Sequence, residues 1–517
     1  MLPPFRNEPY VDFSQPGPRE SMLAALRKVE GELGNFYPLR IGGERISTQE
    51  RIRSVNPARP SQVVGESARA NAAQANQAIQ AASSAFDAWR RTEPEVRARY
   101  LLKAAAILRR RIYEFSAWLT FEVSKSWPEA YADAAEAVDF LEFYAREMLR
   151  LGGAHPTVPY PGEENELRYI PLGVGVVIAP WNFPLAIFAG MLTAAAVTGN
   201  TVVAKPASQA PVIAAKFVEV LEEASVPAGV VIFVPGSGSE VGDVLTDHPL
   251  TRFIAFTGSK EIGLRIFQRA ARVQPGQKWL KRTVLEMGGK DAIVVDETAD
   301  LDAAAEGVVA SAFGFQGQKC SACSRLIVLD AVYDALVERV LERASRLTVG
   351  DPADGANFMG AVIDSSARAK ILEYIEVGRS EGKLLLGGGP PGDAGEGYFV
   401  SPTIFGEVDS GARIAQEEIF GPVLAIIRAR DFAEAARIFN GTEYGLTGAL
   451  YSNDRTRLEY ARREFHCGNL YLNRKCTGAL VGVQPFGGFN MSGTDSKAGG
   501  RDYLQLFLQG KSISERF

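Results

Sequence analysis

Two cysteines, Cys320 and Cys323, stand three residues apart in the glycine-broken stretch GFQGQKCSACSR. Such a pair can be half of a zinc site, a redox dithiol, or one nucleophile beside an inert neighbour. We expect no metal, because the other cysteines, Cys467 and Cys476, do not repeat this spacing and only three histidines are present. A dithiol is expected at a helix start near a βαβ unit, whereas this pair follows a small-residue helix. Both cysteines could also be inert core residues, the commonest fate of a cysteine.

Two further residues supply, together with Cys320, the chemical groups that thioester chemistry needs. Glu286 ends the β-branched run TVLE, with glycines behind it, and Asn182 lies in the proline-bounded loop APWNFP after another apolar run. A thiol, a carboxylate and an amide donor supply a nucleophile, a general base and a stabiliser for an oxyanion. This combination favours one working nucleophile, Cys320, over a metal site or a dithiol.

The composition is that of a soluble protein with more than one core. The chain has 517 residues, of which 46% are hydrophobic and 23% charged, and this length predicts two or three domains. Its net charge is -5 and it has no basic run, so we expect no nucleic acid as a partner. The 4 cysteines are too few for a disulfide framework and no secretory signal opens the sequence, which together predict a cytoplasmic protein.

One uncharged stretch, from Tyr169 to Ala204, is long enough to span a membrane. Prolines at 171, 180 and 184 and several glycines divide it into pieces too short to cross a bilayer. A buried strand, a loop and a small-residue helix explain it better, because strands covered on both faces are continuously apolar. We therefore expect no membrane as a partner.

Strand and helix patterns alternate from Gly173 onward. VGVVIAP, TVVAKP, VVIFVPG and RFIAFTG are short β-branched runs, each followed by a helical pattern. This alternation predicts βαβ units and hence a parallel, doubly wound sheet, which binds ligands beyond the carboxyl ends of its strands. After TVLEMGG the alternation begins again, with SRLIVL and LAIIRA among its strands, and predicts a second α/β domain. The first 150 residues are predicted to be mostly helical after the extended segment FYPLRIGGERI.

Seven motifs occur in the order and approximate spacing of the aldehyde dehydrogenase superfamily: APWNFP, AKPAS, FTGSKEIG, LEMGGKDA, FGFQGQKCSA, QEEIFGPV and QPFGGFNMSG. The sequence resembles this family from about Tyr37 to its C-terminus. The resemblance implies an α/β, aldehyde-dehydrogenase-like fold with two doubly wound α/β domains and a small β oligomerisation extension. We expect a dinucleotide-binding domain in residues 1–147 and 171–285, a catalytic thiol domain in 286–487, and the extension in 148–170 and 498–517. The extension would join the subunits of a homodimer or higher homo-oligomer.

The same resemblance assigns catalytic roles to three residues. It implies that Cys320 is the nucleophile and that Glu286 is the base for the hydrolytic water. The oxyanion would be held by the Asn182 side-chain amide and the backbone N–H of Cys320. The implied activity is NAD(P)-dependent oxidation of an aldehyde through a cysteine thioester.

The resemblance also assigns residues to the cofactor: Trp181, Lys205, Ser208, Gly258, Ser259, Gly263, Glu418 and Phe420. Lys205 and Glu418 would hold the two riboses, and Ser259, at a helix start, would bind the pyrophosphate, because a helix N-terminus offers free N–H groups and a positive dipole end. Ser208 stands where many NAD-preferring relatives carry an acid that repels a 2′-phosphate, so we expect NAD with tolerance of NADP. By contrast, GSGSEVG at 236–242 misses the GxGxxG fingerprint by one position, and we interpret it as a strand-to-helix turn.

Three stretches, FRNEP, GQKCSA and TGALVGVQPFGGF, resemble the branch of the family that acts on L-glutamate γ-semialdehyde, which forms from 1-pyrroline-5-carboxylate. The residues implied for this substrate are Phe183, Lys319, Ser321, Gly478, Ala479 and Phe486. The serine and the backbone at 478–479 would hold the carboxylate, since glycine lets the main chain approach closely. The two phenylalanines would line the aliphatic chain, with ordinary core packing as their alternative, and the lysine could add positive charge.

The expected reaction is therefore oxidation of glutamate γ-semialdehyde to L-glutamate in proline catabolism, with a separate proline dehydrogenase as a candidate partner. Another semialdehyde dehydrogenase, such as one for succinate semialdehyde, is the alternative within the class. A non-redox cysteine acyltransferase or hydrolase would want a histidine beside the thiol. A dinucleotide-binding protein without catalysis would need only the cofactor residues.

Overall fold

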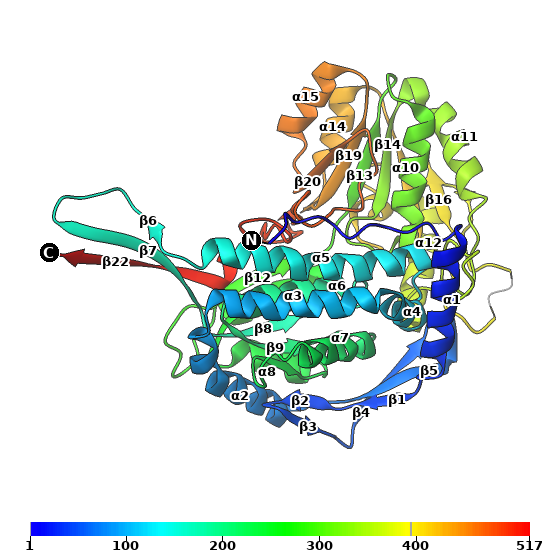
Figure 1. Ribbon diagram of the computed structural model, residues 1–517. Helices are drawn as coiled ribbons and strands as arrows, with labels where there is room; N and C mark the ends of the chain where they lie inside the picture. The colour runs from blue at the N-terminus through cyan, green and yellow to red at the C-terminus, as the bar shows by residue number, and fades with distance from the viewer. Residues whose placement is uncertain (1, 393–394) are drawn as a thin grey trace.

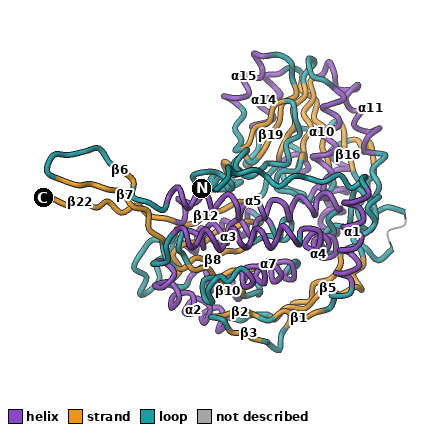
Figure 2. The backbone as a smooth tube through the Cα atoms, in the orientation of Figure 1, coloured by secondary structure: helices purple, strands orange, loops and turns teal. Residues whose placement is uncertain are grey.

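A computed structural model describes residues 2–392 and 395–517. Two seven-stranded sheets, each covered by helices, occupy the lower and upper parts of Figure 1. A three-stranded ribbon projects from one side of the molecule, and Figure 2 shows it standing away from the helices. The fold class expected from the sequence, α/β with two doubly wound sheets and a small β extension, is confirmed.

The first sheet is mainly parallel. Its order is β12-β11-β8-β9-β10-β2-β3, in which only the β10–β2 and β2–β3 pairs are antiparallel. Its strands are β2 Leu39–Ile41, β3 Glu44–Ile46, β8 Val174–Ile178, β9 Thr201–Lys205, β10 Val231–Phe233, β11 Thr251–Thr257 and β12 Arg282–Glu286. The four apolar runs after Gly173 are β8 to β11, as predicted. Every residue of β8 and β9 is buried, which explains why both are continuously apolar.

The helices around this sheet are α1 Pro16–Glu30, α2 Ala72–Arg90, α3 Pro94–Arg110, α4 Ile112–Val123, α5 Trp127–Leu151, α6 Ala186–Val197, α7 Pro211–Glu223, α8 Asp243–Asp247 and α9 Lys260–Ala270. α2 begins at Asn71, whose side chain forms a capping box with Gln74. α3 and α5 each carry a proline in their first turn, where the missing N–H breaks no hydrogen bond. α5 packs against α3, α4 and α6 and buries most of its residues.

The second sheet has the order β15-β16-β17-β14-β13-β19-β20 and is parallel except for the β15–β16 pair. Its strands are β13 Asp291–Val295, β14 Cys323–Leu329, β15 Lys383–Leu386, β16 Thr403–Gly406, β17 Val423–Ala429, β19 Thr447–Tyr451 and β20 Asn469–Leu472. Its helices are α10 Leu301–Phe313, α11 Tyr333–Ala344, α12 Ser365–Glu381, α13 Arg413–Gln416, α14 Phe432–Asn440 and α15 Arg455–Glu464.

One strand pair was missed by the sequence pattern, which predicted helix in this region. β4 Arg51–Asn56 and β5 Arg59–Ala68 pair antiparallel, and β5 also pairs with β1 Asn35–Tyr37. The buried residues of this pair include Ser54, Asn56 and Ser67. Because polar residues occupy the covered face, the apolar alternation that marks a strand is absent.

The uncharged stretch from Tyr169 to Ala204 forms the end of a ribbon strand, β8, a loop, α6 and most of β9. No helix in the described part of the chain is both long and apolar enough to cross a membrane. The GSGSEVG segment forms a short π-helix at 238–242 that continues into α8, so it is a strand-to-helix connection as interpreted.

The projecting ribbon consists of β6 His155–Pro156, β7 Glu163–Pro171 and β22 Leu508–Arg516. β22 pairs antiparallel with β7 along its whole length. Val158, Tyr160 and Phe517 are exposed in this region. A role in joining subunits stays a prediction.

The last two strands, β18 Tyr444–Gly445 and β21 Phe489–Asn490, form a separate pair.

Candidate active site

Segments from both sheets meet at one cavity. Asn182 follows β8, Glu286 is the last residue of β12, and Cys320 lies just before β14 of the second sheet. The cavity has a volume of about 530 Å³, and both Cys320 and Glu286 line it. The carboxyl edge of the first sheet therefore faces the segment that leads into β14.

The chain before Cys320 is held in a conformation that most residues rarely adopt. Phe315, Gln316 and Gly317 have φ values of 50°, 56° and 65°. The side-chain amide of Gln316 fixes this turn by donating to two backbone carbonyls, at 3.0 and 2.8 Å. A Cβ atom at Gly289 would lie 2.5 Å from the carbonyl oxygen of Cys320, so a glycine is needed where the turn after β12 approaches the nucleophile's loop.

The Cys320 thiol is half-buried and holds its proton in this state. Burial raises the pKa of the thiol well above its ordinary value, and the carboxylates of Asp291, Glu418 and Glu286 raise the pKa further. The backbone N–H of Ser321 acts in the opposite direction. A proton acceptor is therefore required before the sulfur can attack a carbonyl carbon.

Glu286 has the properties of a general base. Its Oε1 accepts a hydrogen bond from the Ser496 hydroxyl at 2.5 Å, and its Oε2 accepts one from the Gly488 N–H at 3.3 Å. Burial raises the pKa of Glu286 to about 7, and these hydrogen bonds limit the rise because they favour the charged form. A carboxyl group that titrates near neutral pH can accept a proton and release it within one turnover. Sequence analysis missed Ser496, because a serine in a glycine-rich tail carries no signal of its own.

Asn182 is buried and points at the nucleophile's loop. Its Nδ2 donates to the carbonyl of Gln318 at 3.2 Å, two residues before Cys320. The loop that carries it is anchored further along, where the N–H of Ala186 donates to the buried carboxylate of Asp133 at 2.7 Å. The Asn182 amide therefore contacts the loop that carries Cys320, and its role towards an oxyanion stays a prediction.

Lys205 is the last residue of β9, and Ser208 follows this strand. Lys205 is buried, and burial lowers the pKa of its ammonium group to about 8. Its Nζ donates to the carbonyl of the adjacent Pro206 at 3.2 Å, which leaves further donors for a ligand oxygen. Ser208 is exposed three residues beyond Lys205.

Ser259 caps the N-terminus of α9. Its hydroxyl accepts a hydrogen bond from the N–H of Ile262 at 3.4 Å, and Gly258 donates to the carbonyl of Glu286 at 3.0 Å. A Cβ atom at Gly263 would lie 2.4 Å from the sulfur of Met287, so this glycine lets α9 pack closely on the chain after β12. The packing accounts for Gly263, and its contact with a ligand stays a prediction.

Glu418 and Phe420 lie between α13 and β17, and Trp181 follows β8. The Oε1 atom of Glu418 accepts from the Gly289 N–H at 2.9 Å, and burial raises the pKa of the carboxyl group. The rings of Trp181 and Phe420 meet edge to face with centroids 5.4 Å apart. A lysine ammonium, a carboxylate and a helix N-terminus together fit the ribose hydroxyls and pyrophosphate of a dinucleotide.

All six residues implied for the substrate line the same cavity as Cys320 and Glu286: Phe183, Lys319, Ser321, Gly478, Ala479 and Phe486. Gly478 has a φ of 78°, a conformation that favours glycine. Lys319 is already paired, because its Nζ lies 2.6 Å from the carboxylate of Glu129. The structure brings these residues together, and their contacts with a substrate stay predictions.

The family is shown by comparison with known proteins. The model of the aldehyde dehydrogenase family matches residues 45–513. This chain belongs to the aldehyde dehydrogenase family. A 1-pyrroline-5-carboxylate dehydrogenase of Geobacillus kaustophilus is 61% identical over 517 residues, covering 100% of both chains. A crystal structure of 1-pyrroline-5-carboxylate dehydrogenase from Thermus with bound NAD has a TM-score of 0.98 and 57% identity, again over 100% of both chains.

A longer protein contains a similar unit. Proline utilization A (PutA) from Bdellovibrio bacteriovorus has a TM-score of 0.97 and 46% identity, and the match covers 99% of this chain and 53% of that chain. The aldehyde dehydrogenase fold described above therefore corresponds to about half of that protein.

Acidic residues of α5 complete the cavity of this aldehyde dehydrogenase and were missed by sequence analysis. Glu129, Asp133 and Glu136 recur at helical spacing in SWPEAYADAAEAVDF, and Glu129 and Glu136 line the cavity. Burial raises the pKa of Glu136 to about 8. Acids recurring on one face of an otherwise apolar helix were the available signal.

The remaining cysteines lie in the core of this aldehyde dehydrogenase. All four cysteines are free thiols, and Cys323, Cys467 and Cys476 are buried. The Cys323 thiol donates to the carbonyl of Arg325 at 3.4 Å. Among the residues that line the cavity, Cys320 is the only cysteine in the described part of the chain.

Proposed function

We propose that this protein oxidises L-glutamate γ-semialdehyde to L-glutamate, with NAD as the hydride acceptor, as a step of proline catabolism. The observation that carries the proposal is one cavity lined by the Cys320 thiol, the Glu286 carboxyl group and the chain at 478–479. The printed names of relatives at 61% and 57% identity, both 1-pyrroline-5-carboxylate dehydrogenases, support the same substrate.

The first stage forms a bond between sulfur and carbon. The Cys320 thiol loses its proton to solvent, and the sulfur attacks the aldehyde carbon. The aldehyde oxygen becomes an oxyanion. It accepts hydrogen bonds from the Asn182 amide and the backbone N–H of Cys320, which stabilise the developing charge.

The second stage oxidises and releases the product. Bound NAD supplies the hydride acceptor. Loss of hydride from the hemithioacetal leaves a thioester on Cys320. Glu286 takes a proton from water, and the water oxygen attacks the thioester carbon. The carbon–sulfur bond then breaks, which releases L-glutamate, and the departing sulfur takes up the proton from Glu286 to restore the thiol. A thiol is needed because its adduct can lose hydride and still leave an acyl group that water can cleave.

The cavity wall distinguishes an amino acid semialdehyde from succinate semialdehyde. It carries acids, Glu129 and Glu136, together with bases, Lys319, Arg474 and Lys475. Glutamate semialdehyde presents both an ammonium and a carboxylate group, whereas succinate semialdehyde presents only a carboxylate. Walls of both signs therefore favour the amino acid.

A substrate panel read by NADH absorbance tests the proposal. We expect kcat/KM for glutamate semialdehyde to exceed that for succinate semialdehyde by about 10-fold or more. Succinate semialdehyde has no ammonium group to interact with the acids of the cavity wall, and leaving them unmatched disfavours its binding. A preference for succinate semialdehyde would contradict the substrate assignment.

A non-redox hydrolase is the rival from another class. Thioester hydrolysis without NAD, combined with no NADH from any aldehyde, would favour it. None of the three histidines, His155, His248 and His466, is among the residues that line the cavity in the described chain. The base that such an enzyme normally places beside its thiol is thus not a histidine here.

Four further properties belong to this proposal. NADP is tolerated because Ser208 does not repel a 2′-phosphate, and a lack of turnover with NADP at saturating aldehyde would refute this. The protein is a homodimer or higher homo-oligomer joined through the β7–β22 ribbon, which light scattering of a ribbon deletion tests. It acts in the cytoplasm. A proline dehydrogenase is its partner, an idea supported by the likeness to half of PutA and tested by co-purification.

A further inference from the structure

An extended N-terminal segment, residues 5–13, which we call the strap, lies across the cavity. It precedes the residues that the family model matches, 45–513, and it begins with the FRNEP motif. Figure 1 shows the chain running from the N mark along α5 towards α1. Tyr10, Val11 and Phe13 of the strap line the cavity itself. The substrate site is therefore partly built from residues outside the matched family region.

One buried carboxylate on α5 holds the strap. Asp139 is 4% exposed, and its two oxygens accept from the backbone N–H of Glu8 at 2.7 Å and the Asn7 amide at 2.8 Å. Phe5 packs edge to face against Phe143, also on α5, with ring centroids 5.2 Å apart. The strap is thus fixed to α5 by both polar and apolar contacts.

The same Asn7 amide reaches the loop expected to bind the substrate carboxylate. Its Nδ2 also donates to the carbonyl of Val481 at 2.9 Å, two residues after Ala479. On the other side, the Arg474 guanidinium donates to the carbonyl of Gly478 at 3.1 Å. Both hydrogens of the Asn7 amide are used, one on α5 and one on the loop. The loop is therefore held at both ends, and the strap supplies one of the two holds.

We propose that the strap determines substrate specificity and that Asn7 is a positioning residue, which fixes the loop with Gly478 and Ala479 relative to α5 and Cys320. The inference rests on the function proposed above. Asn7 does not touch the reacting atoms, so it acts on binding of the amino acid end rather than on the chemistry at the thiol. An aldehyde without a carboxylate makes no use of the loop and is insensitive to Asn7.

Comparison of two aldehydes tests this role. In Asn7→Ala, the loop loses its hydrogen bond from Asn7, and Asp139 loses a donor. We therefore expect KM for glutamate semialdehyde to rise about 10-fold while kcat stays the same. The kcat/KM for propanal, which has no carboxylate, stays at the wild-type value. Arg6→Ala is the matched control, because the Arg6 side chain is exposed on the same strap.

A merely structural role predicts something different. Equal losses with both aldehydes, or an unchanged KM for glutamate semialdehyde, would overturn the inference. Calorimetric titration with L-glutamate provides a readout without turnover: we expect affinity for Asn7→Ala to fall about 10-fold, and unchanged affinity counts against the role. If Asn7→Ala does not fold, Phe5→Ala, which removes the contact with Phe143, is measured against the same criteria.

The two proposals fail separately. A wild-type enzyme that ignores glutamate semialdehyde refutes the proposed function and this inference with it. If the wild-type enzyme uses this substrate but Asn7→Ala lowers kcat/KM equally for both aldehydes, the role of the strap alone is refuted.

Discussion

In the first sheet, the carboxyl ends of β9 and β12 carry polar groups with unused hydrogen-bonding capacity, whereas in the second sheet the ends of β13, β19 and β20 lead to polar groups that bind one another. Lys205 and Glu286, at the ends of β9 and β12, belong to the first kind. Both are buried, and burial shifts both of their pKa values towards neutrality. We call this the open edge.

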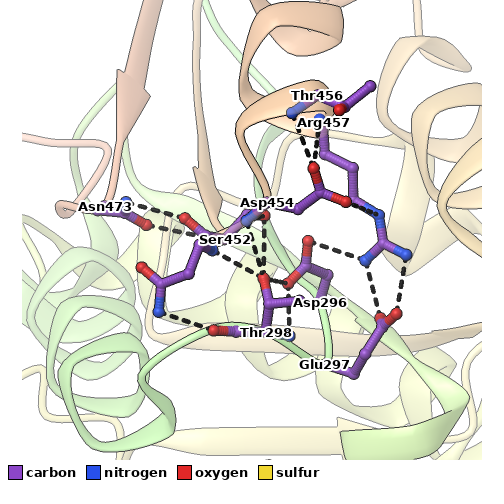
Figure 3. Close-up of polar contacts among 9 residues, drawn as sticks. Asp296, Glu297, Thr298, Ser452, Asp454, Thr456, Arg457 and Asn473 are labelled. Carbon is purple, nitrogen blue, oxygen red and sulfur yellow. Dashed lines mark hydrogen bonds and ion pairs between the residues drawn. The ribbon is translucent and has the colours of Figure 1, made fainter.

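The corresponding edge of the second sheet is closed, as Figure 3 shows. Asn473, after β20, exchanges two hydrogen bonds with the backbone of Ser452, after β19, at 2.9 and 3.0 Å. After β13, the Thr298 hydroxyl donates to Asp296 at 2.7 Å. Side chains that follow three strand ends thus form hydrogen bonds within this one cluster.

Arg457 of α15 completes the closed edge. Its guanidinium lies 3.0 Å from the carboxylate of the fully buried Asp296 and 2.8 Å from that of Glu297. Parallel sheets bind ligands at the carboxyl ends of their strands. Both sheets are mainly parallel, so this rule alone predicts a ligand at either edge. The difference teaches that polar residues at such an edge mark a ligand site only when the fold leaves their hydrogen-bonding groups unsatisfied.

The largest effect is expected at the thiol that faces the open edge. Cys320→Ala removes the nucleophile, so NADH formation falls by about 10⁴-fold or more while the melting temperature is unchanged. Cys323→Ala is the matched control and keeps most of the activity, because that thiol is buried in the core. Loss of activity in both variants would mean that the pair acts as a dithiol.

Glu286→Gln comes next. The variant keeps the shape of the side chain but cannot take a proton from water, so steady-state turnover falls by about 10²–10³-fold. Because water attacks only after hydride loss, stopped-flow absorbance shows a burst of NADH before a slow steady state. A steady-state rate equal to that of the wild type contradicts the assignment.

Lys205→Met tests whether the open edge binds the dinucleotide. Loss of a charged donor weakens NAD binding by about 10–100-fold, measured by calorimetry. The exposed Lys278 offers a control of the same type in Lys278→Met, for which the dissociation constant stays at the wild-type value. Equal NAD affinity for Lys205→Met and wild type would refute the binding role.

The pH profile gives a smaller effect. Glu286 must be deprotonated to act as a base, and burial raises its pKa to about 7. Turnover therefore rises with pH through about 7 and then levels off, with about a tenfold loss one pH unit below the pKa. A profile that is flat between pH 6 and 8 contradicts this value, and the residual rate of Glu286→Gln serves as the pH-insensitive reference.

The smallest effect on activity is expected at the closed edge. Arg457→Met leaves the buried Asp296 carboxylate without its counter-charge, which lowers the free energy of unfolding by about 1–3 kcal/mol, measured by urea denaturation. Because Asp296, Glu297 and Arg457 are not among the described residues that line the cavity, kcat/KM stays at the wild-type value. A fall in kcat/KM with unchanged stability would show that the second edge also takes part in function.

Much of this fold was predictable from local sequence. β8 and β9 were recognised because their residues are buried on both faces and therefore uniformly apolar. β4 was missed because its covered face carries Ser54 and Asn56, and local propensity cannot anticipate buried polar residues that find partners elsewhere in the chain.

The site residues also divide into those that local sequence predicts and those that it does not. Cys320, Glu286 and Asn182 were found because each stands in a distinctive motif at a strand or helix boundary. The Ser496 bond to Glu286 and the Asn7 bond to Val481 join residues 210 and 474 positions apart, and tertiary packing alone creates them. Single-sequence patterns contain no information about such pairs.

The positions of the two chain ends bear on how the protein should be produced. Residue 2 leads directly into the strap beside the cavity, while the last strand, β22, carries the C-terminus to the tip of the projecting ribbon (Figure 1). A purification tag left on the N-terminus would be joined to the strap, three of whose residues line the cavity, and is expected to change Michaelis constants. A tag on the C-terminus suits kinetic work, and an N-terminal tag suits measurements of subunit assembly.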